Sequence, residues 1–179
     1  ALAGLSSELH AASVGVGAAA ASPGAIFDEA AVAEFAEGSL ARVLGPDYAF
    51  ADRLPRRVRL PAPPFLALSR VTRIDCRPFE LGPASIATEY DVPDPAWHAV
   101  EGQVPYLAMD AQGVLLLLSC LGIDRWLDGV CGFRWLDARL TFLGDRPLAG
   151  QRIDYEIRID RFVEHGQTLL FFSDYLGRV

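Results

Sequence analysis

The chain has 179 residues, of which 51% are hydrophobic and 22% are charged, a length and composition typical of one globular domain with a substantial core. Its formal net charge of -7 disfavours a nucleic-acid partner, because phosphate binding requires a basic surface. No apolar run reaches the ~18 residues that a membrane-spanning helix needs, and the alanine-rich start lacks the cationic region of a signal peptide. We therefore expect a soluble, cytoplasmic protein.

The first 24 residues differ in composition from the rest. They are mainly Ala, Ser and Gly and end in Ser-Pro-Gly, which predicts a linker or flexible tail and suggests that the chain was cut from something longer. Residues 25–179 form the predicted domain. Its cysteines lie far apart, with neither CxxC nor metal-ligand spacing, so we expect ordinary thiols and no metal site; they are Cys76, Cys120 and Cys131.

The first half of the domain predicts one helix and two strands. Residues 26–44 place apolar side chains close to helical spacing and stop at Gly-Pro, as an amphipathic helix does. A proline-rich crossing over 59–65 is extended. Residues 66–74 then predict a strand, and residues 84–92 alternate between apolar and polar side chains as a half-buried strand does.

The second half contains a long apolar segment followed by more alternation. Residues 106–121 predict a helix buried on most sides; Gly113 within it costs about 1 kcal/mol relative to Ala, which indicates close approach by a backbone or a ligand. Residues 134–143, 152–160 and 168–175 alternate apolar with polar side chains, as half-buried antiparallel strands do.

Strands that alternate and join by short turns predict an antiparallel sheet, and a helix that is apolar on all sides must be enclosed by it. The expected fold class is therefore α+β, with a curled antiparallel sheet wrapped around a long central helix. This arrangement is the hot-dog fold.

Six segments, in this order, carry a resemblance to a known family: FDEAAVAEFAEGSLARVLGPDYAFAD, RRVRLPAPPFLALSRVTRID, TEYDVPDPAW, LLLLSCLGID, ARLTFLGDRPLAG and LLFF. Together they resemble the dehydratase-type hot-dog domains of bacterial polyunsaturated fatty acid synthases, which are relatives of the free-standing β-hydroxyacyl thioester dehydratases. The resemblance extends from Phe27 to Phe172 without large gaps.

The resemblance implies a catalytic pair. In this family a histidine takes the proton from C2 of a 3-hydroxyacyl thioester, and a carboxylate of the central helix handles the hydroxyl that leaves as water. His98 begins His-Ala-Val-Glu-Gly, which matches the family's HxxxG pattern, and Asp110 lies in the predicted helix. A base with a pKa near neutrality and a nearby acid suit this chemistry. The residues alone also allow two structural roles, a packed histidine at a strand-to-helix junction and a carboxylate that favours the helix dipole.

Other expected site residues surround this pair. Backbone amides near the start of the helix should polarise the thioester carbonyl. The expected substrate-binding residues are Gly102, Pro105, Tyr106, Leu107, Gln112 and Gly113. The resemblance implies no metal and no organic cofactor beyond the phosphopantetheine arm of an acyl carrier protein.

The resemblance also implies partners. Dehydratase hot-dogs pair side by side, so we expect a homodimer or a second hot-dog domain. A local basic cluster, which is either a solvated loop or a docking patch for the acidic carrier protein, comprises Arg53, Arg56, Arg57 and Arg59. The chain stops soon after LLFFSDYLGRV, where such folds add a further strand, so a truncated domain is expected.

The resemblance favours dehydration of a 3-hydroxyacyl thioester to the 2-enoyl form. Two alternatives remain open from the sequence. One is a catalytically degenerate hot-dog that stabilises a synthase or holds an acyl chain. The other is a hot-dog thioesterase, which would use a carboxylate-activated water and need the histidine less.

Overall fold

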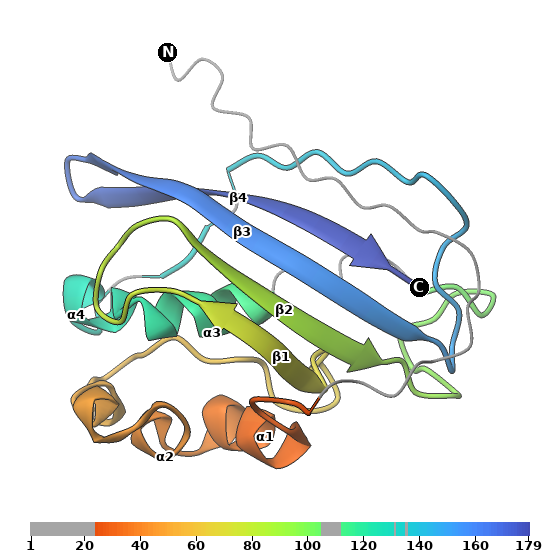
Figure 1. The fold of residues 1–179 in the computed structure, drawn as a ribbon, viewed down its shortest axis with the longest axis horizontal. Coiled ribbons are helices and arrows are strands. Elements are labelled where there is room, and N and C mark those ends of the chain that lie inside the picture. The colour runs from red at the N-terminus through yellow and green to blue at the C-terminus, as the bar shows by residue number, and fades with distance from the viewer. Residues whose placement is uncertain (1–23, 105–111, 131, 135) are drawn as a thin grey trace.

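A computed structural model describes residues 24–104, 112–130, 132–134 and 136–179. The predicted tail therefore lies almost entirely outside the described residues, and the boundary at residue 24 stays a prediction. Within the described ranges the chain is α+β, with helices gathered around a single sheet (Figure 1). No helix there is long and apolar enough to cross a bilayer.

Four antiparallel strands form the sheet, in the order β1-β2-β3-β4. They are β1 (Arg70–Asp75), β2 (Ala84–Asp91), β3 (Arg152–His165) and β4 (Thr168–Arg178). The register brings Ile86, Ile157 and Tyr175 into one row across β2, β3 and β4. All three side chains are buried, so the predicted alternation of these strands is confirmed, with one face toward the core.

The first predicted helix is divided in two, α1 (Glu29–Glu37) and α2 (Leu40–Leu44). The division falls at Gly38 and Ser39, because Ser39 caps α2 by accepting a bond from the Arg42 amide. Its own amide donates to the Glu34 carboxylate at 2.6 Å. Local capping of this kind favours a new helix start over continuation of the old one. Two 3₁₀ turns follow, Pro46–Tyr48 and Ala51–Arg53.

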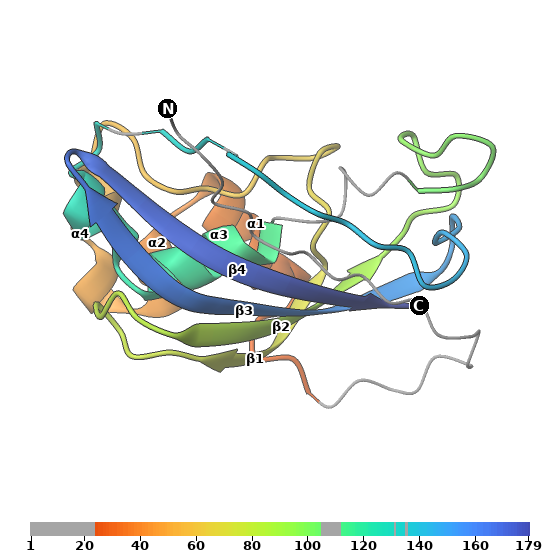
Figure 2. The same ribbon diagram turned by 90° about the horizontal axis from the view of Figure 1, so that it is seen from above.

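The described part of the predicted central helix is α3 (Gln112–Cys120), which leads into α4 (Ile123–Leu127); the earlier part of the prediction lies outside the described residues. Figure 2 shows α3 along one face of the sheet. A Cβ atom added to Gly113 would lie 2.7 Å from Ile157 Cδ1 and 3.1 Å from Thr88 Cγ2. Gly113 is closely approached, as predicted, but by side chains of β2 and β3 rather than by a backbone or a ligand.

One predicted strand is wrong. Residues 134–143 contain no strand among their described members, and Leu136 is 70% exposed while Phe142 is 39% exposed. Alternation supplies the period of a strand, but a strand also needs a neighbour for its backbone groups. Among the described residues of this segment only Arg139 makes a bridge, so the backbone pairing does not extend into a strand of the sheet, which ends at β4.

Candidate functional site

His98 belongs to the loop that follows β2. This loop lies at the end of the sheet away from α4 (Figure 1). Backbone bonds tie this loop to the segment before β3: the Val92 amide donates to Gln151 O at 2.9 Å and the Val104 amide to Pro147 O at 2.8 Å. Val92 and Val104 are buried in a second apolar cluster that also contains Tyr90, the penultimate residue of β2. The loop is therefore anchored at both ends.

The imidazole of His98 lies between two aromatic rings. The Tyr90 ring stacks on it with centroids 6.3 Å apart and planes 28° apart. The Trp97 ring meets it edge-on with centroids 5.1 Å apart and planes 71° apart. Both neighbours are apolar surfaces with no charge to offer the ring.

Both ring nitrogens of His98 are buried and lack a hydrogen-bond partner in the described part of the chain. Burial lowers the pKa of His98 below its ordinary value, because desolvation penalises the charged imidazolium. The ring is thus neutral near neutral pH, and one of its nitrogens keeps a lone pair that can accept a proton. An unpaired buried polar group is costly and calls for a functional explanation.

Gly102 lies in a tight hairpin turn a few residues after His98. Val100 and Gln103 exchange both backbone bonds, at 2.9 and 3.0 Å, while Glu101 and Gly102 between them have φ values of 53° and 78°. Glycine tolerates this left-handed conformation without steric cost. Gly102 is exposed, and its carbonyl accepts a bond from the Ala149 amide at 3.0 Å.

The expected acid, Asp110, lies outside the described residues, as do Pro105, Tyr106 and Leu107. Their roles stay predictions. Gln112 is described, as the first residue of α3. Its side-chain oxygen accepts a bond from the Ala67 amide at 2.7 Å, and its side-chain nitrogen donates to Phe65 O at 2.8 Å. It therefore binds the proline-rich crossing.

Three arginines of the expected patch differ from the fourth. Arg53, Arg56 and Arg59 are exposed. The Arg57 side chain is only 2% exposed; its terminal nitrogens donate to Val58 O at 2.9 Å, Phe35 O at 3.1 Å and Gly38 O at 2.8 Å. Arg59 donates to Ala36 O at 3.1 Å and Gly38 O at 3.3 Å. The sequence placed Arg57 on a basic surface, and this placement is wrong, because its charge is used to satisfy buried carbonyl groups.

Asp124 in α4 is a buried carboxylate that the sequence patterns did not single out. It is 2% exposed and accepts a bond from the Val58 amide at 2.8 Å. Burial raises the pKa of this carboxyl group, because the charged form is desolvated. Together with Arg57 it holds the segment before the crossing in place, at the far end of the sheet from His98.

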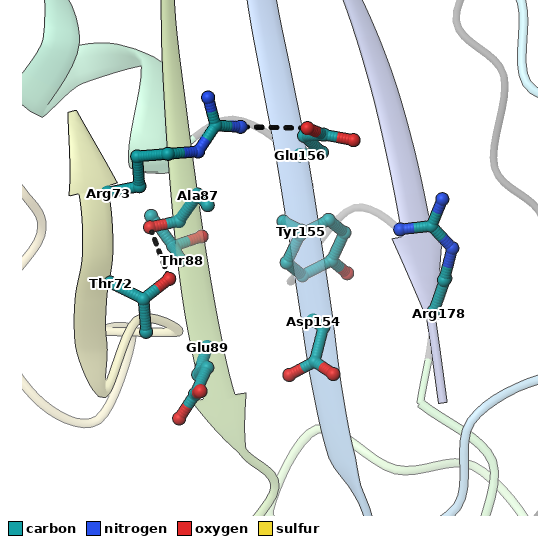
Figure 3. A pocket seen from close by; sticks show the side chains of 9 residues that line it. All are labelled: Thr72, Arg73, Ala87, Thr88, Glu89, Asp154, Tyr155, Glu156 and Arg178. Atoms are coloured by element: carbon teal, nitrogen blue, oxygen red, sulfur yellow. Dashed lines mark hydrogen bonds and ion pairs between the residues drawn. The ribbon is translucent and has the colours of Figure 1, made fainter. Parts of the chain in front are cut away.

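A shallow cavity of about 310 Å³ lies over the sheet, and Figure 3 shows the side chains around it. Arg73 of β1 and Glu156 of β3 form an ion pair across it at 2.8 Å. The pKa of Asp154 is raised, mainly because the carboxylate is partly desolvated and to a smaller extent because the charge of Glu89 lies nearby. The lining carries both signs of charge and does not include His98.

No group of three or more His, Cys, Asp or Glu residues within the described ranges could hold a metal ion. Sequence reasoning also missed Tyr90 and Phe65 as neighbours of the site. Phe65 meets Trp97 edge-on at 5.0 Å. The only sequence signal for this contact is that an aromatic residue ends the proline-rich crossing.

No protein family model matches the chain. One of the subunits of a polyunsaturated fatty acid synthase from Thraustochytrium sp. is 36% identical to it over 156 residues. This similarity covers 84% of the chain but only 10% of that synthase polypeptide. The chain is thus related to one segment, about a tenth, of a polyunsaturated fatty acid synthase polypeptide.

Proposed function

We propose that this chain is a dehydratase-type hot-dog domain of a polyunsaturated fatty acid synthase, which converts a 3-hydroxyacyl thioester to the 2-enoyl form. The observation that carries the proposal is His98, a neutral imidazole whose two nitrogens are buried and unpaired in the described part of the chain. The similarity to a synthase polypeptide supports an acyl substrate held on an acyl carrier protein.

In the proposed reaction, His98 accepts the proton from C2 of the substrate. The electron pair of that bond forms the double bond between C2 and C3, and the bond between C3 and oxygen breaks. Asp110 gives its proton to the departing oxygen, which leaves as water. Proton exchange with solvent then restores neutral His98 and protonated Asp110.

The environment of His98 suits the first step. A neutral imidazole is ready to accept a proton, and its apolar neighbours keep competing water away. Backbone amides near Tyr106 and Leu107 are proposed to stabilise the negative charge on the thioester oxygen, as amides at a helix start can. The phosphopantetheine arm belongs to the substrate carrier, and no metal takes part in the proposal.

The described sheet supports the hot-dog proposal, because α3 runs along one face of a four-stranded antiparallel sheet. Pairing with a second hot-dog domain, or with a second copy, belongs to the same proposal. We assign carrier-protein docking to the exposed Arg53, Arg56 and Arg59, since the Arg57 side chain is buried.

The test uses a 3-hydroxyacyl carrier protein incubated with the chain, and mass spectrometry of the acyl group. Wild type is expected to convert the 3-hydroxyacyl substrate to the 2-enoyl product and, in the reverse direction, to hydrate a 2-enoyl substrate. His98→Ala and Asp110→Asn should yield little of either product. His165→Ala is the matched control, because His165 is exposed at the end of β3. Free acid as product would indicate a thioesterase, and no turnover by folded wild type would indicate a degenerate domain; either result overturns the proposal.

A further inference from the structure

The start of α3 is connected to the His98 loop through residues of the proline-rich crossing. Gln112 uses both ends of its amide, binding the Ala67 amide at 2.7 Å and the Phe65 carbonyl at 2.8 Å. These two bonds reach Phe65, the last residue of the crossing, and Ala67, two residues beyond it. They fix the distance between the crossing and the first turn of α3.

The crossing in turn holds the ring of Trp97. The indole nitrogen donates to Pro64 O at 2.7 Å, and the Phe65 ring meets the indole edge-on at 5.0 Å and 83°. Phe65 is 61% exposed and Trp97 is 56% exposed. Since core packing does not immobilise the Trp97 ring, its hydrogen bond to Pro64 O and its edge-on contact with Phe65 set its orientation.

Trp97 and Tyr90 together define the position of the His98 imidazole. Tyr90 is fixed by the sheet, where it pairs with Ile153 of β3, and its ring stacks on the imidazole. Trp97 covers the imidazole from another direction. One of the two rings that confine His98 is therefore held by the sheet, and the other is held by the crossing to which Gln112 binds.

We propose that Gln112 is a positioning residue for His98, acting through Phe65 and Trp97 to hold the imidazole nitrogens buried and at a set distance from the start of α3. Gln112 does not touch the reacting atoms in this proposal. Its catalytic consequence rests on the proposed function, whereas the coupling between Gln112 and His98 does not depend on turnover.

The surroundings of His98 make this coupling measurable. Among the described residues the rings packed on the imidazole are Tyr90 and Trp97, and burial raises the pKa of Tyr90, so Tyr90 is neutral at ordinary pH. Burial alone lowers the pKa of His98. Loosening the crossing admits water to the imidazole, and water stabilises its protonated form. The pKa of His98 then rises toward its ordinary value.

The experiment is an NMR titration of the His98 ring protons in four proteins: wild type, Gln112→Ala, Trp97→Phe and Gln167→Ala. His98→Ala identifies the His98 signals among the three histidines. Gln112→Ala is expected to raise the pKa of His98. Trp97→Phe, which keeps a ring but loses the bond to Pro64, is expected to raise it less. Gln167 is exposed in the β3–β4 turn, so Gln167→Ala should leave the titration unchanged.

Kinetics provide the second readout. Gln112→Ala is expected to lower kcat about tenfold or more with little change in KM, since small displacements of a catalytic group cost 10- to 100-fold, roughly. Gln112→Glu keeps the acceptor for the Ala67 amide and should fall between Ala and wild type. Circular dichroism confirms that each variant is folded.

An unchanged His98 titration in a folded Gln112→Ala protein would overturn the proposal, and so would an equal shift in Gln167→Ala. If wild type proves inactive, the proposed dehydration is wrong, yet the titration still decides whether Gln112 holds His98 in place.

Discussion

Buried polar groups at the two ends of the sheet differ in how far they are hydrogen-bonded. Near α4, the terminal nitrogens of Arg57 bind three backbone carbonyls and Asp124 Oδ1 accepts a bond from a backbone amide, while Arg57 Nε and Asp124 Oδ2 have no hydrogen-bond partner in the described part of the chain. Near the end of β2, both nitrogens of His98 have no such partner within the described chain. Charge at the first end joins α1, α4 and the crossing together. The unpaired nitrogens at the second end remain available for a ligand.

This contrast separates structural from functional burial. A buried charge that is hydrogen-bonded to backbone groups is costly to remove, because those partners are left unsatisfied. A buried polar ring without hydrogen-bond partners lowers the stability of the fold. Removing such a ring is therefore expected to raise the stability. At the His98 end, the test of this contrast is the rate of catalysis, where the largest effect is expected. At the end that contains Arg57 and Asp124, the tests measure the free energy of unfolding.

The largest expected effect is that of His98→Ala on the dehydration rate. General base catalysis contributes about 10²- to 10⁴-fold, so the rate should fall by that factor. Thermal unfolding should show no matching loss of stability, since no described hydrogen bond is broken. Retention of more than about a tenth of the rate would assign the base to another residue.

Arg57→Met should give the largest loss of stability. It keeps much of the side-chain volume but leaves the carbonyls of Phe35 and Val58 without the Arg57 donor, and leaves Gly38 O with the bond from Arg59 alone. The free energy of unfolding should fall by about 3 kcal/mol, measured by urea denaturation. Arg56→Met, which changes an exposed neighbour, should stay within about 0.5 kcal/mol of wild type; similar losses in both variants would contradict the structural role of Arg57.

Two substitutions of Asp124 should differ from each other. Asp124→Ala removes the acceptor for the Val58 amide and should cost about 1–3 kcal/mol. Asp124→Asn keeps a neutral acceptor and should lie within about 1 kcal/mol of wild type near pH 7. The raised pKa of Asp124 means that its contribution to stability is present below its unfolded pKa and lost as pH rises through the folded pKa. Asn should abolish that decline in urea titrations between pH 4 and pH 7, about the range where carboxyl groups titrate.

The smallest expected effect is the dependence of stability on His98 at acid pH. Its folded pKa is lowered, so the unfolded chain binds the proton more readily and wild type loses stability as pH falls from about 7 through the folded pKa. His98→Leu should show a weaker loss over this range in thermal unfolding, whereas His165→Leu should follow wild type. Parallel curves for wild type and His98→Leu would mean that the ring is not neutral and buried.

Local patterns predicted the strands β2, β3 and β4. The alternation over 152–160 coincides with one buried face, whereas in β2 Glu89 is buried between Thr88 and Tyr90 against the pattern. Local patterns failed at residues 134–143, where the period is equally clear but the described residues form no strand, although this segment runs beside β4 in Figures 1 and 2. Period is a local property of the sequence, and pairing is a property of the whole sheet.

The candidate site was predictable to a similar degree. His98 was identified from a family resemblance, and its position between Tyr90 and Trp97 gives that prediction a physical basis. The partners of Arg57 and Asp124 could not be predicted, because they lie 22 and 66 residues away in the sequence. Only the fold brings Phe35 and Val58 to these side chains.

The missing side chain at Gly113 has a consequence for motion. Because the first turn of α3 touches Ile157 and Thr88 without an intervening Cβ, this turn cannot rotate or slide without displacing the centre of the sheet. Amide hydrogen exchange at Gly113 and Val114 should then be as slow as in the middle of β3, even though helix ends usually fray. A helix start that moves with the sheet gives nearby residues a rigid frame.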